Sequence, residues 1–488
     1  MSRSRSPALV ARLSIACVPC LALGCSSGDS HAQPDSLPST RTAPDAVHVQ
    51  GRTFRDGLGR QLLFRGINVK VPGLFDVTFD DGRTANEQIV PFTADDAARI
   101  EQLGLNVIRL AVNWSGLEPQ PGAYGAAFLA GIDGVVELAR QHHFYVLIDM
   151  HQDAYSKEIG EDGAPLWAIV PPPEQLLQGP YSDDRRTSSQ VLAAGFSFFS
   201  NKPATDGRPL QDAFVQAVRV IVQRYAQEPA VLGYEAYNEP VVLDYRQLDD
   251  FHARFADGVH AVDQDAPVLF EPQATRNQTD SARIPTEPWS HGPGAYAPHI
   301  YTGWFSIPDQ GGWASEDPSV LASSMAHADQ EAQGWGTPLF VTEFGCDQSV
   351  DRGPRWLQAE LDLQDRFLAS STQWVWREAG TWGLSDNNRV ERPATARVLA
   401  RTYPRAVAGD LLGIEHPEPG HLLVRWRATA ATRGLQHEVS LSEVYATNYH
   451  VRCDGAEVSF EAFPGRATFT CPEGDGDRTF EVVGTAAQ

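Results

Sequence analysis

Short apolar or β-branched runs alternate with helical patterns over most of this chain. The runs predict strands at 62–69, 107–110, 145–149, 231–237, 268–271, 297–300, 339–343 and 373–376. Segments such as 93–103 and 128–142 have the apolar spacing of helices between them. Strands that alternate with helices imply a parallel sheet, and a count near eight favours a closed barrel over an open sheet. The predicted fold class is therefore α/β, a (β/α)8 TIM barrel over residues 47–405.

The N-terminus has the pattern of an export signal over residues 1–25. Three arginines in the first twelve residues precede an apolar stretch at 13–23, which is too short to span a bilayer. Residues 22–25, Ala-Leu-Gly-Cys, resemble a bacterial lipoprotein processing site, in which Cys25 would carry the lipid. We expect the protein to be secreted or lipid-anchored to the bacterial cell surface, and both alternatives stay open.

Two other segments depart from the barrel pattern. Residues 26–46 are rich in Ser, Pro, Asp and Thr and predict a flexible linker. Residues 156–210 interrupt the rhythm with Gly, Pro and aromatic residues. This insertion either covers the barrel mouth, where it would meet an apolar substrate, or packs on itself.

After residue 405 the pattern changes to short alternating runs at 422–426, 437–441, 449–453 and 467–471. Residues 406–488 are therefore predicted to form a small β-sandwich. It could bind sugar or membrane, or simply pack on the barrel. Cys453 and Cys471 lie in this region and form the plausible disulfide pair, and Cys346 is expected to be a buried free thiol.

Composition excludes some classes of function. The net charge of −23 supplies no basic surface, so nucleic acid is not an expected partner. The sequence has no metal-ligand spacing such as His-Glu-x-x-His, and we expect neither metal nor cofactor. A monomer is expected.

Polar residues follow the predicted strands at the ends where barrel enzymes place their reacting groups. They are Lys70, Arg109, His151, Asp153, Asn238, Glu239, His299, Tyr301, Glu343 and Trp376. Two of these, Glu239 and Glu343, are carboxylates from distant strands that would face one cavity. Retaining glycosidases need such a pair, one to protonate the leaving oxygen and one to attack the anomeric carbon.

Other residues compete for these roles. Glu271 also ends a strand-like run and is the strongest rival carboxylate, but it lacks a neighbouring Asn, and we assign it a supporting role. Asp149 and Glu235 lie within apolar runs, which is more typical of structural carboxylates. Trp374 and Trp382 lie close enough to Trp376 to share its assignment, and any of the three could belong to the core.

Four motifs in order resemble glycoside hydrolase family five. They are Val-Ile-Arg-Leu at 107–110, Tyr-Asn-Glu-Pro at 237–240, His-Ile-Tyr at 299–301 and Thr-Glu-Phe-Gly at 342–345. Residues 149–153, Asp-Met-His-Gln-Asp, then Gly-Ala-Pro and Trp at 163–167, with a C-terminal β-domain, resemble the endoglycoceramidases. These enzymes release an intact oligosaccharide from ceramide. The sequence around Lys70 is nearer to the branch that accepts galactosylceramide-linked oligosaccharides.

The resemblance implies a role for each catalytic residue. Glu239 would be the general acid/base, Glu343 the nucleophile, and Asn238 would hold the sugar 2-hydroxyl. Arg109 and Tyr301 would keep Glu343 ionised. Glu239 must instead stay protonated near neutral pH, which requires an apolar or carboxylate-rich setting.

The remaining residues would contact substrate. The resemblance implies that His151 and His299 hydrogen-bond the sugar or tune the carboxylates, although a lone His is usually structural. Asp153 resembles a sugar-binding acid, and Lys70 could contact substrate hydroxyls. Trp376 would form the apolar platform beneath the sugar.

The expected function is a retaining hydrolase that cleaves the β-glycosidic bond between oligosaccharide and ceramide. Its partner would be a glycosphingolipid, with contact to a membrane surface. A β-glucanase or β-glucosidase of the same family would share the catalytic residues but lack an apolar ceramide groove. An alternative of another class is a non-catalytic sugar-binding surface protein.

Overall fold

The computed structural model describes residues 44–75, 88–177, 183–304 and 319–487. The predicted export signal and nearly all of the predicted linker lie outside these residues. None of the helices in the described ranges combines the length and hydropathy of a membrane span.

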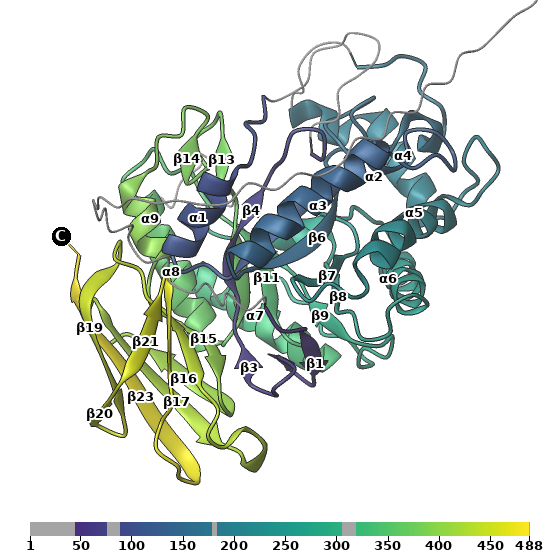
Figure 1. Ribbon diagram of the computed structural model, residues 1–488. Coiled ribbons are helices and arrows are strands. Elements are labelled where there is room, and N and C mark those ends of the chain that lie inside the picture. Colours follow the sequence, from purple (N-terminus) through teal and green to yellow (C-terminus); the bar gives the residue numbers. More distant parts are fainter. Residues whose placement is uncertain (1–43, 76–87, 178–182, 305–318, 488) are drawn as a thin grey trace, which may run out of the picture. The chain divides into compact units, whose positions relative to one another are not determined.

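A parallel sheet of nine strands forms the centre of the fold, in the order β10-β11-β12-β4-β5-β6-β7-β8-β9 (Figure 1). The two strands at its ends, β9 and β10, follow each other directly in the chain, and a parallel bridge joins Tyr296 in β9 to Leu339 beside β11. These connections are consistent with the predicted barrel. The strands are β4 (Arg65–Val69), β5 (Val107–Asn113), β6 (Tyr145–His151), β7 (Val231–Glu235), β8 (Val268–Phe270), β9 (Gly294–Tyr296), β10 (His299–Ile300), β11 (Phe340–Phe344) and β12 (Ser370–Gln373).

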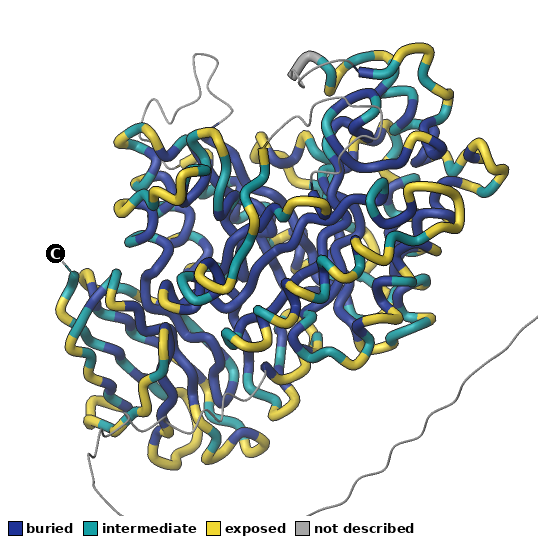
Figure 2. Tube along the Cα trace, turned by 45° about the horizontal axis from the view of Figure 1, so that its top comes forward, coloured by how far each residue is buried: buried dark blue, intermediate teal, exposed yellow. Residues whose placement is uncertain are grey.

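Alternating side chains along these strands build two apolar layers. Phe64, Leu147, Leu269 and Phe340 pack together in one cluster, and neighbours such as Ile148 pack in another with the helices. This is the two-residue period expected of strands. Figure 2 shows the strands buried and the outer helices exposed on one side. The helices are α1 (Ala94–Gln102), α2 (Trp114–Leu117), α3 (Ala126–Gln141), α4 (Ser189–Phe199), α5 (Leu210–Tyr225), α6 (Tyr245–His260), α7 (Ser319–Trp335), α8 (Gly353–Arg366) and α9 (Pro393–Leu399).

The last barrel strand begins three residues earlier than predicted. β12 covers Ser370–Gln373, whose buried side chains are polar, so hydropathy does not reveal it. The strand is instead stabilised by hydrogen bonds: the Ser371 hydroxyl donates to Gln364 at 2.6 Å, and the Thr372 hydroxyl donates to the Thr342 carbonyl at 2.5 Å. The predicted run at 373–376 therefore lies mostly beyond the strand.

Two antiparallel sheets involve the C-terminal region, and the first also includes the N-terminal strands. A seven-stranded sheet joins β1 (His48–Gln50), β2 (Thr53–Arg55), β3 (Gln61–Leu62), β15 (Pro404–Val407), β18 (His437–Ser440), β22 (Arg466–Phe469) and β21 (Phe460–Phe463). A five-stranded sheet joins β16 (Asp410–Glu415), β17 (His421–Ala428), β23 (Gly476–Ala486), β19 (Ala446–Cys453) and β20 (Ala456–Val458). Residues from both sheets share one apolar cluster. The four strands predicted here are present, as β17, β18, β19 and β22.

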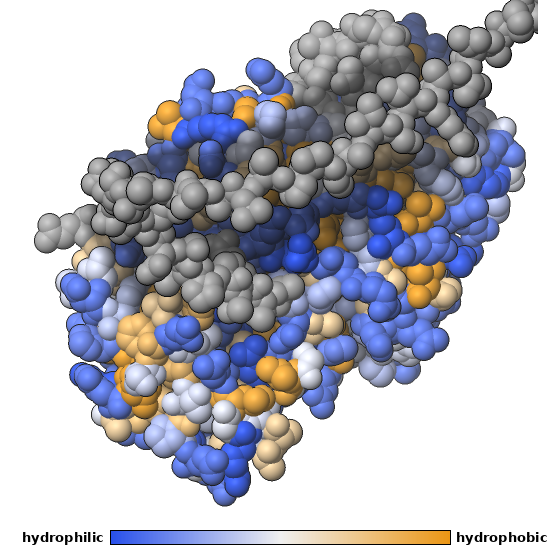
Figure 3. Space-filling view, in the orientation of Figure 1, coloured by the Kyte–Doolittle hydropathy of each residue, from blue (hydrophilic) through white to orange (hydrophobic). Residues whose placement is uncertain are grey.

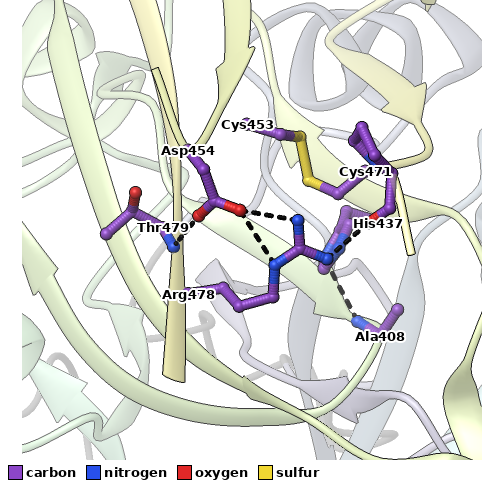
Figure 4. Close-up of a disulfide and its surroundings, with 8 residues drawn as sticks. Ala408, His437, Cys453, Asp454, Cys471, Arg478 and Thr479 are labelled. Carbon is purple, nitrogen blue, oxygen red and sulfur yellow. Dashed lines mark hydrogen bonds and ion pairs between the residues drawn. A yellow bond between two sulfur atoms is a disulfide. The ribbon is translucent and has the colours of Figure 1, made fainter. Parts of the chain in front are cut away.

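The predicted disulfide between Cys453 and Cys471 is confirmed, with the two Cα atoms 5.6 Å apart (Figure 4). Cys453 ends β19 in one sheet, and Cys471 lies two residues beyond β22 in the other, so the bond connects the two sheets. Next to it, Arg478 donates to Asp454 at 2.6 Å. Cys346 is a buried free thiol, also as predicted.

Candidate active site

A cavity of about 760 Å³ lies where the parallel strands end. Seven of the ten predicted site residues line it, and three do not. Those that line it are Lys70, His151, Asp153, Asn238, Glu239, Tyr301 and Glu343. The sequence rule that polar residues follow barrel strands therefore predicts most of the polar lining of this cavity.

The two candidate catalytic carboxylates face each other in this cavity. Glu239 follows β7 and Glu343 lies in β11, and a carboxylate oxygen of each lies within 4.8 Å of the other. Retaining glycosidases hold their two carboxyl groups ~5–5.5 Å apart, whereas inverting enzymes need ~6.5–9.5 Å to admit a water molecule. The spacing fits attack by one carboxylate on the anomeric carbon itself.

Glu343 is held by the two predicted partners. The Arg109 guanidinium donates to Oε1 of Glu343, and the Tyr301 hydroxyl donates to Oε2 at 2.7 Å. The Glu343 side chain is 6% exposed. Both carboxylate oxygens are thus fixed, which orients the group for nucleophilic attack.

Arg109 is fully buried and does not itself line the cavity, so it is not a substrate-binding residue, and only its predicted contact with Glu343 is present. It lies instead among four carboxylates, those of Asp149, Glu235, Glu271 and Glu343. Burial alone would lower the pKa of Arg109, but these carboxylates raise it well above its ordinary value. Arg109 is a permanent cation that neutralises the acidic centre of the barrel.

Glu239 adopts a left-handed backbone conformation with φ of 46°, which is uncommon for a residue with a side chain. Its backbone N–H donates to Glu271 Oε2 at 3.0 Å, and Gln152 Nε2 donates to the preceding carbonyl, of Asn238, at 2.6 Å. These bonds hold the strained residue. They also explain why a glutamate four residues past β7 can turn toward the cavity.

The predicted electrostatic setting of Glu239 is wrong for the free protein. Its Oε1 accepts a hydrogen bond from Asn277 at 2.8 Å and lies 2.9 Å from His299 Nδ1. Burial raises the pKa of Glu239, but the hydrogen bond from His299 and the charges of His299, Arg186 and His151 outweigh burial and lower the pKa to about 2. Glu239 is therefore a carboxylate at neutral pH before substrate binds.

Trp376 does not form the predicted platform. Its indole N–H donates to Asp96 at 3.2 Å, and the side chain packs away from the cavity. Trp374 and Trp382 line the cavity instead. Because β12 ends at Gln373, the first residue beyond the strand is Trp374, and it takes the position that the sequence assigned to Trp376.

A model of the cellulase family, glycosyl hydrolase family 5, matches residues 72–380, more than half of the chain. The chain belongs to glycosyl hydrolase family 5. The matched segment includes both carboxylates, Arg109 and every cavity residue named above except Lys70 and Trp382.

This family 5 chain is similar to several endoglycoceramidases. It is 28% identical to endoglycoceramidase I of Rhodococcus hoagii over 92% of this chain and 89% of that protein. It is 27% identical to an endoglycoceramidase of Hydra vulgaris over 75% of this chain and 74% of that one. Among solved structures, endo-glycoceramidase II from Rhodococcus sp. in a cellobiose-like imidazole complex is 25% identical, with a TM-score of 0.75 over 88% of this chain and 99% of that chain.

His151 and Lys70 both lie against the Trp374 ring in one wall of the cavity. The His151 ring stacks on the Trp374 ring with centroids 5.6 Å apart, and the Lys70 ammonium lies 5.4 Å from the same ring. His151 Nδ1 lies 2.6 Å from Asp149, but burial lowers the pKa of His151 to about 3, with Arg109 adding to the effect. His151 is therefore a neutral hydrogen-bonding group at neutral pH.

Asp153 reaches the cavity, where the Arg186 guanidinium forms an ion pair with it. Arg186 also lies 3.5 Å from Glu161, and all three side chains line the cavity. Burial and the charge of Glu161 raise the pKa of Asp153 well above its ordinary value. A sugar that binds Asp153 would meet this ion pair.

His299 is fully buried and does not line the cavity, so a direct contact with sugar is excluded and only the predicted tuning of carboxylates remains. The sequence missed Asn277, which approaches Glu239 from the short helix η3 (Ala274–Gln278) rather than from a strand end. It also missed Glu378, whose Oε2 lies 3.7 Å from Lys70 Nζ in the cavity wall.

Two groups of side chains in the described ranges have the spacing of metal ligands: Glu239, His299 and Glu343, and Glu235, Glu271 and His299. The Arg109 guanidinium already contacts Glu235, Glu271 and Glu343. A cation of fixed charge thus occupies the position where a metal ion would balance these carboxylates. The donor set does not fit a metal centre.

Proposed function

We propose that this chain is a retaining hydrolase that cleaves the β-glycosidic bond between the oligosaccharide and the ceramide of a glycosphingolipid. The observation that carries the proposal is the pair of carboxylates, Glu239 and Glu343, within 4.8 Å of each other in a cavity whose outer wall is apolar. The similarity to endoglycoceramidases over most of both chains supports it.

The reaction follows from the positions of the two carboxylates. Glu343 attacks the anomeric carbon while Glu239 protonates the departing ceramide oxygen, which leaves a glycosyl ester on Glu343. Water then attacks the same carbon, Glu239 accepts its proton, and Glu343 is released. Asn238 Oδ1 accepts a hydrogen bond from Arg109 at 2.8 Å, and one N–H of its Nδ2 donates to the Gln152 carbonyl at 3.0 Å. The second N–H of Nδ2 would donate to the sugar 2-hydroxyl.

The apolar wall distinguishes a glycolipid hydrolase from a glucanase. Helix α4 contributes Val191, Leu192, Phe196 and Phe199 to the cavity, and Val241 adds to them from the loop after Glu239. A glucan has sugars on both sides of the cleaved bond and gains little from such a surface. A ceramide chain gains about 0.8 kcal/mol for each methylene group that it buries there.

We infer that the rim beside this wall contacts the lipid surface that holds the substrate. Val241 lines the cavity, and Val241, Leu243 and Tyr245, which lie between Glu239 and the first turn of α6, are 46%, 81% and 40% exposed. Among the coloured residues in Figure 3, hydrophilic ones predominate, and apolar residues form separate groups between them. We also propose that the protein is secreted or lipid-anchored at the bacterial cell surface. The two C-terminal sheets are proposed to form a β-sandwich.

The test is incubation of the purified protein with gluco- and galacto-linked glycosphingolipids and with soluble glucans, with products identified by mass. Intact oligosaccharide plus free ceramide is the expected result. Cleavage of glucans alone would favour a glucanase, and cleavage of neither would favour a sugar-binding protein.

The variant Glu343→Gln is the control for this assay. Replacing the nucleophile should lower kcat by at least about a thousandfold, because no glycosyl ester can form in the usual way. Full activity in Glu343→Gln would contradict the assignment.

A further inference from the structure

Two buried side chains behind Glu239 extend its polar contacts away from the cavity. His299 lies between two carboxylates: its Nδ1 is 2.9 Å from Oε1 of Glu239, and its Nε2 is 3.4 Å from Oε2 of Glu271. The backbone N–H of Glu239 donates to the same Oε2 atom of Glu271. The three residues therefore form a closed loop of contacts. Neither His299 nor Glu271 can touch substrate, because both are buried outside the cavity.

The proposed reaction requires a source for the proton that Glu239 donates. A general acid must carry a proton when the substrate is cleaved. Glu239 is a carboxylate in the free protein, with a pKa lowered to about 2 for the reasons given above. The proton has to reach Glu239 from a neighbour, and the ceramide that covers the cavity wall would keep bulk water away.

The surroundings of His299 and Glu271 favour a proton on this pair of side chains. Burial alone would lower the pKa of His299, but the charges of Glu271 and Glu343 and the hydrogen bonds to Glu239 and Glu271 raise it well above its ordinary value. Burial raises the pKa of Glu271 as well. Since a carboxylate faces each imidazole nitrogen, a neutral ring would leave one nitrogen lone pair against an oxygen.

Other charged groups around this pair come from every strand that packs against it. They are Arg109 from β5, Asp149 from β6, Glu235 from β7, Glu343 from β11, and Tyr301 beyond β10. Arg109 is the one fixed cation in this set, and it is shared among four carboxylates. The excess of carboxylates favours a second positive charge, which an imidazolium supplies.

We propose that His299 is the proton store of the acid/base Glu239, and that Glu271 is the positioning residue that keeps the proton on His299 between turnovers. The proposal rests on the proposed function and deepens it. When glycolipid covers Glu239, the lost solvation favours its neutral form, and the proton moves from His299 Nδ1 to Glu239 Oε1 along the 2.9 Å contact.

The proton balance closes over one turnover. In the first half, the O–H bond of Glu239 breaks and the proton leaves on the ceramide oxygen as the glycosyl ester forms on Glu343. Glu239 is then a carboxylate beside a neutral His299. In the second half, Glu239 removes a proton from the attacking water, whose oxygen joins the anomeric carbon as the ester bond breaks. The proton returns from Glu239 to His299, and the resting state is restored.

The test is the pH dependence of kcat/KM in Glu271→Gln, measured on a glycolipid that the wild type cleaves. The substitution keeps an oxygen for the Glu239 N–H but removes the negative charge behind His299. The alkaline limb should move to lower pH by at least about one unit, because an opposite charge at this distance shifts a pKa by ~1–3 units. Glu360→Gln is the matched control: Glu360 is a fully buried glutamate in α8 outside the cavity, and its loss should leave the limb in place.

A second substrate separates proton supply from structural damage. A dinitrophenyl β-glycoside of the same sugar needs no protonation of its leaving group. Glu271→Gln should therefore lose much less kcat/KM on this substrate than on glycolipid, at a pH where its activity on glycolipid has fallen about tenfold or more. An unchanged alkaline limb on glycolipid, or an equal loss on both substrates, would overturn the proposal.

Histidine titration decides the matter if Glu271→Gln does not fold. NMR spectra are recorded for the wild type and for His299→Gln, both with ¹⁵N-labelled histidine. The imidazole signals that disappear in the variant are those of His299. They should stay in one protonation state from about pH 6 to pH 8, and a midpoint near the ordinary value of ~6.5 would overturn the proposal. A wild type that cleaves neither substrate would refute the proposed function, whereas the titration would still report on the proton store.

Discussion

Glu239 has to give a proton in one half of the proposed reaction and take one in the other. Glu239→Ala removes both steps, but only substrates with poor leaving groups need the first. We expect kcat/KM on glycolipid to fall by about a hundredfold or more, with a much smaller loss on a dinitrophenyl glycoside of the same sugar. Steady-state rates on the two substrates measure the difference, and equal losses would argue that Glu239 has a different role.

The sequence could not decide whether Trp374 or Trp376 forms the apolar platform beneath the sugar. In the structure Trp374 lines the cavity and Trp376 does not. Trp374→Ala should lower kcat/KM by up to about tenfold, because the aromatic face it offers contributes ~0.5–1.5 kcal/mol beyond area burial. Trp376→Phe is the control, since Trp376 lies outside the cavity and donates to Asp96. It should cost stability rather than activity. Activity assays with both variants, and melting curves to show that each is folded, check this prediction.

At the scale of single residues, the sequence predicts which side chains meet in the cavity but not their protonation. Barrel geometry alone predicts that residues such as Glu239 and Glu343 meet, because parallel strands end at one edge. Arg109 and His299 also lie near strand ends, but they are buried behind the residues that line the cavity. The position of a residue along a strand does not predict whether its side chain reaches the cavity. The pKa of Glu239 depends on His299, a neighbour 60 residues away, which no local pattern encodes.

Helix α4 is the element that should confer preference for a lipid leaving group. Leu192→Ala and Phe196→Ala each remove apolar surface from the cavity wall. Each should lower kcat/KM on glycolipid about tenfold, since ~1–3 kcal/mol of contact with the ceramide chains is lost. Neither should affect a soluble aryl glycoside. Ser189→Ala, at the exposed start of the same helix, is the matched control, and losses that are equal on both substrates would contradict the assignment.

At the scale of elements, hydropathy predicts strands well where they are apolar and poorly where they are not. Seven of the eight predicted barrel strands and all four predicted C-terminal strands overlap observed strands by two or more residues, whereas β9 was not predicted. β12 is displaced because its buried residues are hydroxyl and amide side chains that hydrogen-bond instead of excluding water. Of the two alternatives for the insertion at 156–210, the structure supports the one at the cavity, because Phe196 lines it. Phe198 packs against Phe214 and Tyr237, which lie outside the insertion, so the segment does not simply pack on itself.

At the scale of the whole molecule, the sequence did not anticipate that strands from both ends of the chain share one sheet. β3 pairs with β15, so residues near the start of the barrel segment complete a sheet of the C-terminal region. Such pairing joins residues more than 300 positions apart, and no local pattern reports it. Residues Arg41–Gln488 accordingly form one compact unit.

Asp365 of α8 forms a buried ion cluster with Arg65, Arg401 and His416, which connects the barrel to the C-terminal strands. Asp365 lies 2.7 Å from Arg65 in β4 and 3.3 Å from His416 beyond β16, and it also pairs with Arg401. Burial alone would raise the pKa of Asp365, but the charges of Arg401 and Arg65 and the hydrogen bond from His416 lower it well below its ordinary value. The cluster is therefore formed with an ionised Asp365.

The lowered pKa of Asp365 sets the direction of a pH effect on stability. A carboxyl group whose pKa is lower in the folded state stabilises the protein above its unfolded pKa of ~3.9, and this contribution is lost as pH falls toward the folded pKa. Asp365→Asn should lower the free energy of unfolding by about 3 kcal/mol at pH 7, because buried cations lose their partner. The difference between wild type and variant should narrow below about pH 4, where Asp365 takes up a proton in the unfolded chain while it is still ionised in the folded protein.

Urea unfolding of both proteins from pH 7 to pH 3 measures this difference. Asp362→Asn is the matched control, since Asp362 pairs with the same Arg401 at 2.6 Å but its side chain is 58% exposed. An exposed pair contributes at most about 1 kcal/mol, so this variant should unfold close to the wild type at every pH. If Asp365→Asn were as stable as Asp362→Asn at pH 7, the cluster would not be what joins the barrel to the C-terminal strands, and the shared sheet that contains β3 and β15 would have to hold them together.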